Sequence, residues 1–214
     1  MPPIARETII ALDPLLHGVA ARDLHKMVMR MIDADDLDVQ RPRADAGVLW
    51  RRDNATLTVR VRPDITLDVP DRLGCVVVAR DIAETAPGDT VAINVLCNRQ
   101  YTPRVHIPPE VRALAHSASD AALRPARMVP VGPESLDEWA GQRLARAGVT
   151  VTEYRAEVAD DVTLDNHRTR QRVPAARIRA TVAGGAATNA LLTRGLGRAK
   201  SYGLGLVVRT DLNN

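Results

Sequence analysis

The residues best suited to chemistry lie in two short stretches near opposite ends of the chain. ARDLHKMVMRMI contains His25 followed by Lys26, and GLGRAKSYGLG at positions 195–205 places Arg198 and Lys200 among four glycines. An imidazole with a pKa of about 6.5 can give or accept a proton at neutral pH. Glycines let backbone amides approach an anion closely. The only two lysines of the sequence fall in these stretches, which favours a role for a compact ammonium group in each.

A helix over residues 20–32 is expected to position the histidine. At about 100° per residue, its apolar side chains form a single arc, made of Leu24, Met27, Val28, Met31 and Ile32. His25 lies at the edge of that arc, and Arg22 lies just beyond it. The helix can therefore anchor His25 and still leave it in reach of solvent. The alternative is a purely structural histidine at a helix edge.

The glycine-rich stretch is not a known nucleotide-binding loop. A Walker loop requires glycines where Ala199 and Arg194 stand, and the dinucleotide fingerprint requires a third glycine where Lys200 stands. The stretch also follows a short helix and precedes the last strand, which is the reverse of the order that both motifs need. It is interpreted as a turn that brings amides and cations close to an anion, the alternative being a helix cap with a flexible connection.

Composition predicts an ordinary globular protein, since 45% of the 214 residues are hydrophobic and 26% are charged. No apolar run approaches the roughly 20 residues that span a bilayer, and the first residues lack the pattern of a signal peptide. We therefore expect a cytoplasmic protein without membrane contact. Cys75 and Cys97 lie in apolar runs without metal-ligand spacing, and both are interpreted as buried free thiols.

Positive charge is concentrated at the end of the chain. The net charge is +3, yet the segment from residue 165 onwards carries nine Arg and Lys against two acids. Arg168, Arg170 and Arg172 alternate within it, so a strand there would place all three on one face. Such a row suits the phosphate edge of an RNA stem. The alternative is a solvated strand face paired with nearby aspartates.

The first half of the sequence has the order strand, helix, hairpin, strand. The strand is expected at 6–13, the hairpin at 47–64 around Asn54 and Ala55, and the further strand at 75–83. This order begins a split βαβ, ferredoxin-like unit. The turn Pro87, Gly88, Asp89 places a domain boundary near residue 88.

The second half repeats the theme. A strand is expected at 89–97, followed by a helix at 135–148 that opens with a Ser135 and Glu138 capping box. Three strands (149–159, 162–173 and 175–184), a short helix (186–193) and a last strand (205–210) follow. The predicted fold class is α+β, with two tandem ferredoxin-like (βαββαβ, RRM-like) domains. Residues 1–88 would carry the active-site helix, and residues 89–214 the glycine-rich loop.

These stretches together resemble a known family. GLGRAKSYGLGLVV resembles the glycine-rich signature of the CRISPR repeat-processing endoribonucleases, most closely the CasE branch of the type I-E Cascade. ARDLHKMVMRMI resembles the helix of that branch that carries a leucine, histidine and basic triplet, and GVLWRRD with LTVRVRPD resembles its first hairpin. The resemblance implies two tandem ferredoxin-like domains and metal-independent cleavage at the base of a repeat hairpin. It also implies that the protein keeps its product and joins the Cascade assembly.

The resemblance assigns roles residue by residue. His25 matches the active-site histidine of the family, and Lys26 matches the basic residue after it. The RNA-binding positions that it and the basic segment suggest are Gly195, Gly197, Arg198, Lys200, Ser201, Gly203, Arg168, Arg170 and Arg172. Arg22 departs from the family, because many relatives carry a tyrosine there that assists the chemistry. Its guanidinium cannot transfer a proton near neutral pH, but it can stabilise charge on phosphate.

RNA brings its own nucleophile, the 2′-hydroxyl beside the scissile phosphate. A protein has to align the attack, move protons and stabilise the charge that develops. We expect His25 to be the general base or acid, with Lys26 and Arg22 on the phosphate oxygens. The products would be a 2′,3′-cyclic phosphate and a 5′-hydroxyl.

The scheme calls for no metal and no cofactor. The histidines are scattered over positions 17, 25, 106, 116 and 167, and His17 ranks second to His25 as the catalytic candidate. The aspartates at 33, 35, 36 and 38 are interpreted as a solvated helix end, since two-metal nucleases draw carboxylates from several elements.

The expected partners are the CRISPR repeat hairpin and other Cascade subunits, with no DNA contact by the isolated protein. Two alternatives remain open. One is a catalytically inactive RNA-binding scaffold subunit of the same superfamily, motivated by Arg22. The other is an unrelated ferredoxin-like domain whose glycine loop binds a small phosphorylated ligand.

Overall fold

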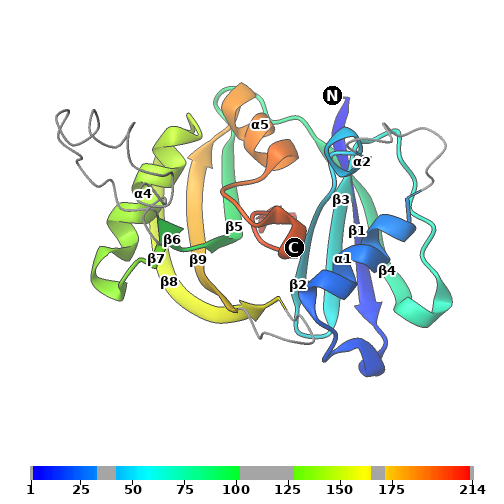
Figure 1. The fold of residues 1–214 in the computed structure, drawn as a ribbon. Helices are drawn as coiled ribbons and strands as arrows, with labels where there is room; N and C mark the ends of the chain where they lie inside the picture. The colour runs from blue at the N-terminus through cyan, green and yellow to red at the C-terminus, as the bar shows by residue number, and fades with distance from the viewer. Residues whose placement is uncertain (1, 33–41, 102–127, 165–171, 213–214) are drawn as a thin grey trace, which may run out of the picture.

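Two antiparallel sheets lie side by side in the computed structural model, which describes residues 2–32, 42–101, 128–164 and 172–212 (Figure 1). Each large sheet has four strands, in the orders β2-β3-β1-β4 and β10-β5-β9-β8. Numbered within its own sheet, each order is the 4-1-3-2 arrangement that a βαββαβ chain produces, read from the opposite edge in the first case. The predicted fold class, α+β with two tandem ferredoxin-like domains, is confirmed.

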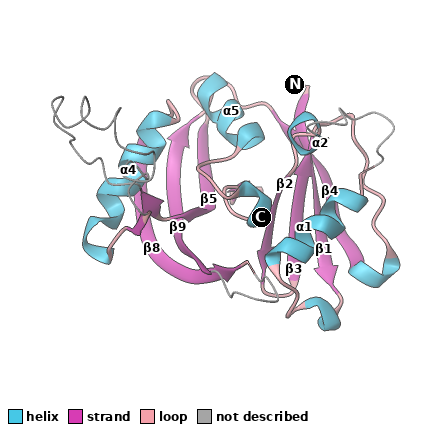
Figure 2. Cartoon of the chain, in the orientation of Figure 1, coloured by secondary structure: helices cyan, strands magenta, loops and turns pink. Residues whose placement is uncertain are grey.

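The first sheet is covered on one face by the predicted histidine helix. The strands are β1 (Pro3–Leu12), β2 (Leu49–Asp53), β3 (Thr56–Val61) and β4 (Gly74–Ala83), and the helices are α1 (Ala21–Arg30) and the short α2 (Pro42–Asp45). Figure 2 shows α1 lying across the strands. Leu24 and Val28 of α1 are fully buried against Ile10, Leu57 and Val59 of the sheet. The 3₁₀ turns η1 (Pro14–Leu16) and η3 (Asp71–Leu73) complete this half, η3 standing where a ferredoxin-like unit has its second helix.

The second sheet has both of its helices. Its strands are β5 (Thr90–Asn98), β8 (Val151–Thr163), β9 (Arg172–Ala183) and β10 (Val207–Arg209), and its helices are α4 (Leu136–Arg146) and α5 (Ala186–Arg194). A two-stranded ladder and two 3₁₀ turns are added to it: β6 (Gln100–Tyr101), β7 (Val129–Pro130), η5 (Pro133–Ser135) and η6 (Lys200–Tyr202). In the described part of the chain, no helix is long and apolar enough to cross a membrane.

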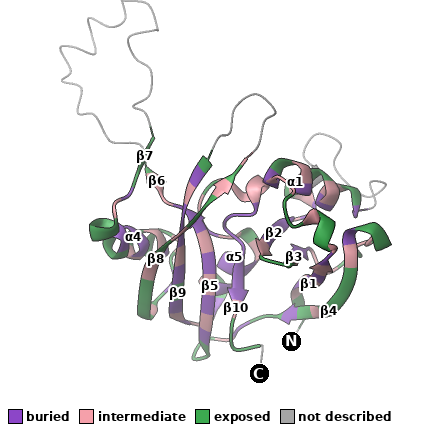
Figure 3. Cartoon of the chain, turned by 90° about the horizontal axis from the view of Figure 1, so that it is seen from below, coloured by how far each residue is buried: buried purple, intermediate pink, exposed green. Residues whose placement is uncertain are grey.

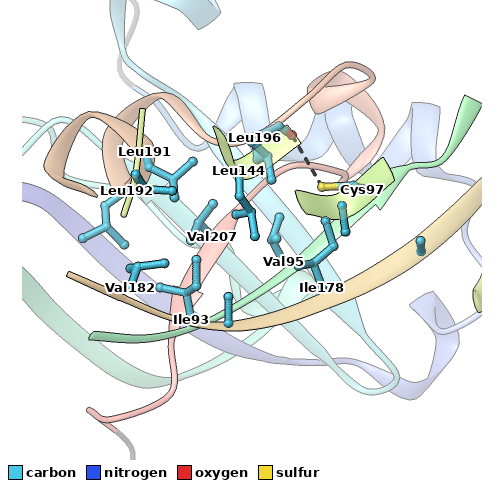
Figure 4. Packing of buried hydrophobic residues seen from close by; sticks show 14 of the residues in the cluster. Ile93, Val95, Cys97, Leu144, Ile178, Val182, Leu191, Leu192, Leu196 and Val207 are labelled. Atoms are coloured by element: carbon cyan, nitrogen blue, oxygen red, sulfur yellow. Dashed lines mark hydrogen bonds between the residues drawn. The ribbon is translucent and has the colours of Figure 1, made fainter. Parts of the chain in front are cut away.

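Both helices of the second domain pack on one face of its sheet. Leu144 of α4 and Leu192 of α5 are fully buried against Ile93, Ile178 and Val207 (Figure 4). The Cys97 thiol lies in the same cluster and donates to the carbonyl oxygen of Leu196, with 3.8 Å between sulfur and oxygen. Helix α5 and the start of the glycine-rich loop, at Leu196, therefore pack on this core.

A buried ion pair joins the two domains. Arg60 on β3 pairs with Glu7 on β1, and both side chains are excluded from solvent. The other end of the same guanidinium donates to two carbonyl oxygens of the second domain, those of Leu192 at 2.9 Å and Val207 at 2.6 Å. Arg80 on β4 also donates to Glu7, at 2.7 Å. The Arg60 side chain on the first sheet thus joins the two domains through its hydrogen bonds to the second.

Three details differ from the prediction. Ser135 makes no capping hydrogen bond, because it ends the turn η5 with φ −106° and ψ 8° instead of an extended cap conformation. Glu138 accepts a hydrogen bond from Gln142 and does not form a capping box. Cys75 is exposed, since β4 is an edge strand with many solvent-facing positions (Figure 3).

Where three strands are predicted between 149 and 184, the described residues contain β8 and β9. These pair as one long antiparallel ladder that extends to Thr163 opposite Arg172. The two described ends of the strand predicted at 162–173 belong to β8 and β9 instead. Residues 165–171, with Arg168, Arg170 and His167, lie outside the described ranges, as do the aspartates at 33, 35, 36 and 38. The turn at Pro87 and Gly88 connects β4 to β5.

Candidate active site at the domain junction

Helix α1 presents His25 and Lys26 to different surroundings. Leu24 and Val28 turn into the core, so position 25 falls at the margin of the buried face. His25 is half-buried, and its Nδ1 atom is shielded from solvent without a hydrogen-bond partner in the described structure. Lys26 is exposed and forms an ion pair with Asp23 one turn earlier, at 2.9 Å. Although the two residues are adjacent in sequence, His25 is half-buried and Lys26 is exposed to solvent.

The glycine-rich loop packs against α1 and β2 of the other domain. Gly203 has φ +79°, and a Cβ atom on it would lie 2.7 Å from Cζ3 of the Trp50 ring. Gly195 has φ +68°, and a Cβ there would collide with the carbonyl oxygen of Gly205, which accepts a hydrogen bond from the amide of Leu196 at 2.8 Å. The glycines are therefore required for the loop to fold on itself and to contact Trp50. Figure 1 shows this C-terminal segment running between the two sheets, beside β2.

Arg43, which the sequence reasoning missed, links the histidine to the loop. Burial lowers the pKa of His25 below 6.5, and the positive charge of Arg43 lowers it further. Burial and the charge of Arg43 likewise lower the pKa of Lys200. Both effects require Arg43 to lie near both groups. One residue each from α1, α2 and η6 therefore converges at the junction.

The cluster of His25, Arg43 and Lys200 contains two cationic side chains. Lys200 donates to the carbonyl oxygen of Arg194, and the Nε atom of Arg43 is shielded without a partner. Among the described residues, no carboxylate forms an ion pair with any member of the cluster. Two unpaired nitrogens and two cations in a partly desolvated place are suited to an anion. The only sequence signal for Arg43 was a cation just after Pro42 and shortly before β2.

A pocket of about 380 Å³ opens at the start of α1, and the three residues of the cluster are not among those that line it. Ala21 and Leu24 of the helix, Trp50 of β2 and Tyr202 of η6 line it, together with His17, the second histidine candidate. Its walls come from both domains, so docking of the glycine loop creates it. The surface at the start of the helix that carries His25 is therefore concave.

The remaining predicted residues are spread more widely. Arg22 is on the exposed side of α1, and Ser201 is half-buried in η6. Arg198 is exposed and faces a different pocket, on the side of α4. Arg172 is exposed at the first position of β9. Within the described ranges, no three His, Cys, Asp or Glu side chains gather as metal ligands would.

The side chains of the cluster can take part in proton transfer and can stabilise negative charge. A histidine whose pKa lies below 6.5 is mostly neutral at pH 7 and can accept a proton. Cations beside it can stabilise negative charge that develops on a phosphate during reaction. The cluster thus combines a base with electrostatic stabilisation.

Comparison with solved structures finds the same fold over nearly the whole chain. The CRISPR endoribonuclease Cse3 bound to a 19-nucleotide RNA superposes with a TM-score of 0.70 at 16% identity, covering 98% of this chain and 100% of that one. The CRISPR-associated protein Cas6e from Escherichia coli gives 0.65 at 13% identity, covering 96% and 98%. A chain of a CRISPR RNA-guided surveillance complex gives 0.58 at 24% identity, covering 95% and 98%.

Sequence comparison agrees with the fold. No curated protein sequence matches the chain. Residues 13–208, however, match the family described as CRISPR associated protein, and this match includes the histidine helix and the whole glycine-rich loop. The resemblance to CasE-like repeat-processing proteins is thereby confirmed at the level of family and fold, and the chain belongs to the CRISPR associated protein family.

Proposed function

We propose that this chain is a metal-independent endoribonuclease that cuts precursor CRISPR RNA within the repeat hairpin and remains bound to the mature crRNA as a Cascade subunit. One observation supports the proposal: the glycine-rich loop packs against α1, and Arg43 acts electrostatically on both His25 and Lys200. Two similar structures support the substrate and the assembly, since one is a CRISPR endoribonuclease bound to RNA and another is a chain of a CRISPR RNA-guided surveillance complex.

The reaction begins with the 2′-hydroxyl next to the scissile phosphate. His25, neutral at pH 7, accepts the hydroxyl proton while the 2′-oxygen forms a bond to phosphorus. The bond from phosphorus to the 5′-oxygen then breaks, and the leaving oxygen takes up a proton from solvent. A 2′,3′-cyclic phosphate and a 5′-hydroxyl remain. The low pKa of His25 supports the role of general base over that of general acid.

Charge stabilisation is assigned to Arg43 and Lys200. Arg43 lies near both His25 and Lys200, and the desolvation that lowers the pKa values of the two cations also strengthens their attraction to a phosphorane. Lys26 is less suited to this role than the sequence suggested, because its ammonium is exposed and paired with Asp23. Arg22, also exposed, is retained as a contact to RNA outside the reacting phosphate.

The test is cleavage of a synthetic repeat hairpin from the same genome, in EDTA, by wild type, His25→Ala and His17→Ala. We expect a cut with a cyclic-phosphate end that falls by about 10² to 10⁴-fold in His25→Ala, because general acid–base catalysis contributes that much. His17→Ala tests the second histidine candidate, which lines the pocket at the start of α1, and it should keep most of the activity if His25 is the base.

The outcomes separate the competing functions. Binding of the hairpin without any cut by wild type would favour the inactive scaffold subunit. A cut of equal rate in His25→Ala would remove His25 from the mechanism. Neither binding nor cutting would overturn the proposal as a whole.

A further inference from the structure

A second hollow, of about 660 Å³, lies on the α4 side of the second domain. Helix α4, the β6 and β7 ladder and the glycine-rich loop enclose it; we call it the α4 pocket. Three arginines line it: Arg143 and Arg146 from α4, and Arg198 from the loop. The first two are absent from the sequence-based list of RNA contacts.

The spacing of three residues along α4 places their side chains together at the α4 pocket. Trp139, Arg143 and Arg146 follow one another at spacings of four and three residues, so they share one face of α4. The Arg143 guanidinium stacks over the Trp139 ring at 5.2 Å from its centroid. Such a stack holds the guanidinium in a fixed plane, and its Nη2 atom also donates to the carbonyl oxygen of Gln100 at 3.5 Å.

Arg198 brings a third cation to this face. The loop approaches α4 closely, since a Cβ atom on Gly197 would lie 3.7 Å from Nη1 of Arg143. Burial lowers the pKa of Arg143, and the nearby charges of Arg146 and Arg198 lower it further. Like charges that face one pocket repel each other until an anion enters between them.

The carboxylates of the α4 pocket are at its opposite end. Glu134 and Glu138 line it near the start of α4, and Glu138 accepts a hydrogen bond from Gln142 at 3.1 Å. At about 1.5 Å of rise per residue, Arg146 lies roughly 12 Å along the axis from Glu138. The cationic end of the pocket is therefore the end that meets the glycine-rich loop.

That loop also connects the α4 pocket to the candidate active site. Arg198 and Lys200 are two residues apart, which spans at most about 7 Å of extended chain. Lys200 belongs to the cluster around His25, whereas Arg198 faces the α4 pocket. A single strand of RNA passing over the loop would meet both cations in succession.

We propose that the α4 pocket binds the single-stranded RNA that continues from the scissile phosphate, with Arg143, Arg146 and Arg198 on its phosphates. The concave pocket has the volume for a splayed nucleotide. Unpaired bases stack on arginine planes, so the Arg143 guanidinium, held over the buried Trp139 ring, suits such a nucleotide. The inference rests on the proposed function, since it assigns a path to the same RNA.

The experiment compares two RNAs in direct binding across a salt series. One is the repeat hairpin with its single-stranded flanks, and the other is the hairpin trimmed flush; both carry a 2′-deoxy group at the cleavage position to prevent cutting. The variants are Arg146→Gln and Arg198→Gln. Their side chains are exposed, as is that of Arg72 on η3, so Arg72→Gln is the matched control.

For the flanked RNA, each variant should lose affinity and should reduce the slope of log K against log salt by about 0.7, the value for one phosphate contact on a single strand. Affinity for the trimmed hairpin and for both RNAs in Arg72→Gln should stay unchanged. Equal losses on the two RNAs, or no loss on either, would overturn the inference while wild type still binds and cuts. Failure of wild type to bind either RNA would instead overturn the proposed function.

Discussion

Gly203 in the C-terminal loop lies directly against the Trp50 ring on β2, and no side chain fits between them. A Cβ atom at position 203 would be 2.7 Å from Cζ3 and 3.0 Å from Cη2 of the ring. The contact crosses from one domain to the other and supports the 3₁₀ turn that carries Lys200. The position of Lys200 beside α1 therefore depends on having glycine, which has no side chain, at position 203.

Gly203→Ala should destabilise the protein and weaken cleavage. Its φ of +79° is strained for alanine, at a cost on the order of 1–3 kcal/mol, and the collision with Trp50 adds to it. The matched control is Gly88→Ala, which has φ +98° but nothing within 4 Å of the added Cβ. Urea unfolding and cleavage assays should show a larger loss at 203 than at 88. Equal losses would mean that the Trp50 contact is unimportant.

The pKa of His25 should lie below 6.5 in the free protein and rise in Arg43→Gln. Burial and the charge of Arg43 both disfavour the imidazolium, so removing that charge restores part of its stability. NMR titration of the imidazole measures this directly, with Arg22→Gln as a control from the same helix. A His25 pKa at or above 6.5 in wild type would contradict the prediction.

The lowered pKa of His25 also determines in which direction the cleavage rate changes with pH. Because the neutral imidazole is the active base, kcat/KM should fall as the pH drops through the pKa of His25, with a midpoint below 6.5. In Arg43→Gln the midpoint should move upwards. A rate that increases towards lower pH would instead assign His25 as the general acid.

Glu7→Gln should be far more destabilising than Asp81→Asn. Removing the carboxylate leaves Arg60 charged and excluded from solvent, at a cost of about 3–5 kcal/mol. Asp81 pairs with Arg6 on the surface at 3.2 Å, so its loss should change stability by about 1 kcal/mol or less. Denaturant unfolding of the two variants tests the difference, and similar values would show that the buried pair does not hold the domains.

Glu7 also predicts how wild-type stability responds to acid. Burial raises the pKa of this carboxyl, but Arg60 and Arg80 outweigh burial and hold it below its ordinary value of 4.5. The unfolded chain therefore binds the proton more readily, and stability from this group is lost as the pH falls below 4.5. Unfolding of Glu7→Gln should lack this contribution in the same pH range.

The two thiols should differ sharply in reactivity. Cys75 is exposed, whereas burial raises the pKa of Cys97 to about 12. Alkylation at pH 8 should modify one thiol in the native protein and two in denaturant, because the thiolate is the reactive form. Modification of both in the native state would mean that the core around Leu196 opens readily.

Local sequence patterns determined the elements that carry the site. The apolar arc of α1 put His25 at the edge of a buried face, and the observed helix agrees. Gly195 ended α5 as its position after Arg194 suggested. These features depend on interactions between residues a few positions apart, which composition and spacing record. The capping box at Ser135 failed because the preceding proline and glutamate form a turn of their own.

Only the tertiary structure decided which of these residues meet. Arg43 joins His25 and Lys200, and Arg143 meets Arg198, although nothing in the local sequence relates their elements. The domains come together through Gly203 against Trp50 and through Arg60 with the carbonyl of Val207. Such contacts are selected by shape, burial and charge across residues distant in the chain. The sequence therefore determined a histidine helix and a basic glycine loop, and domain docking made them one site.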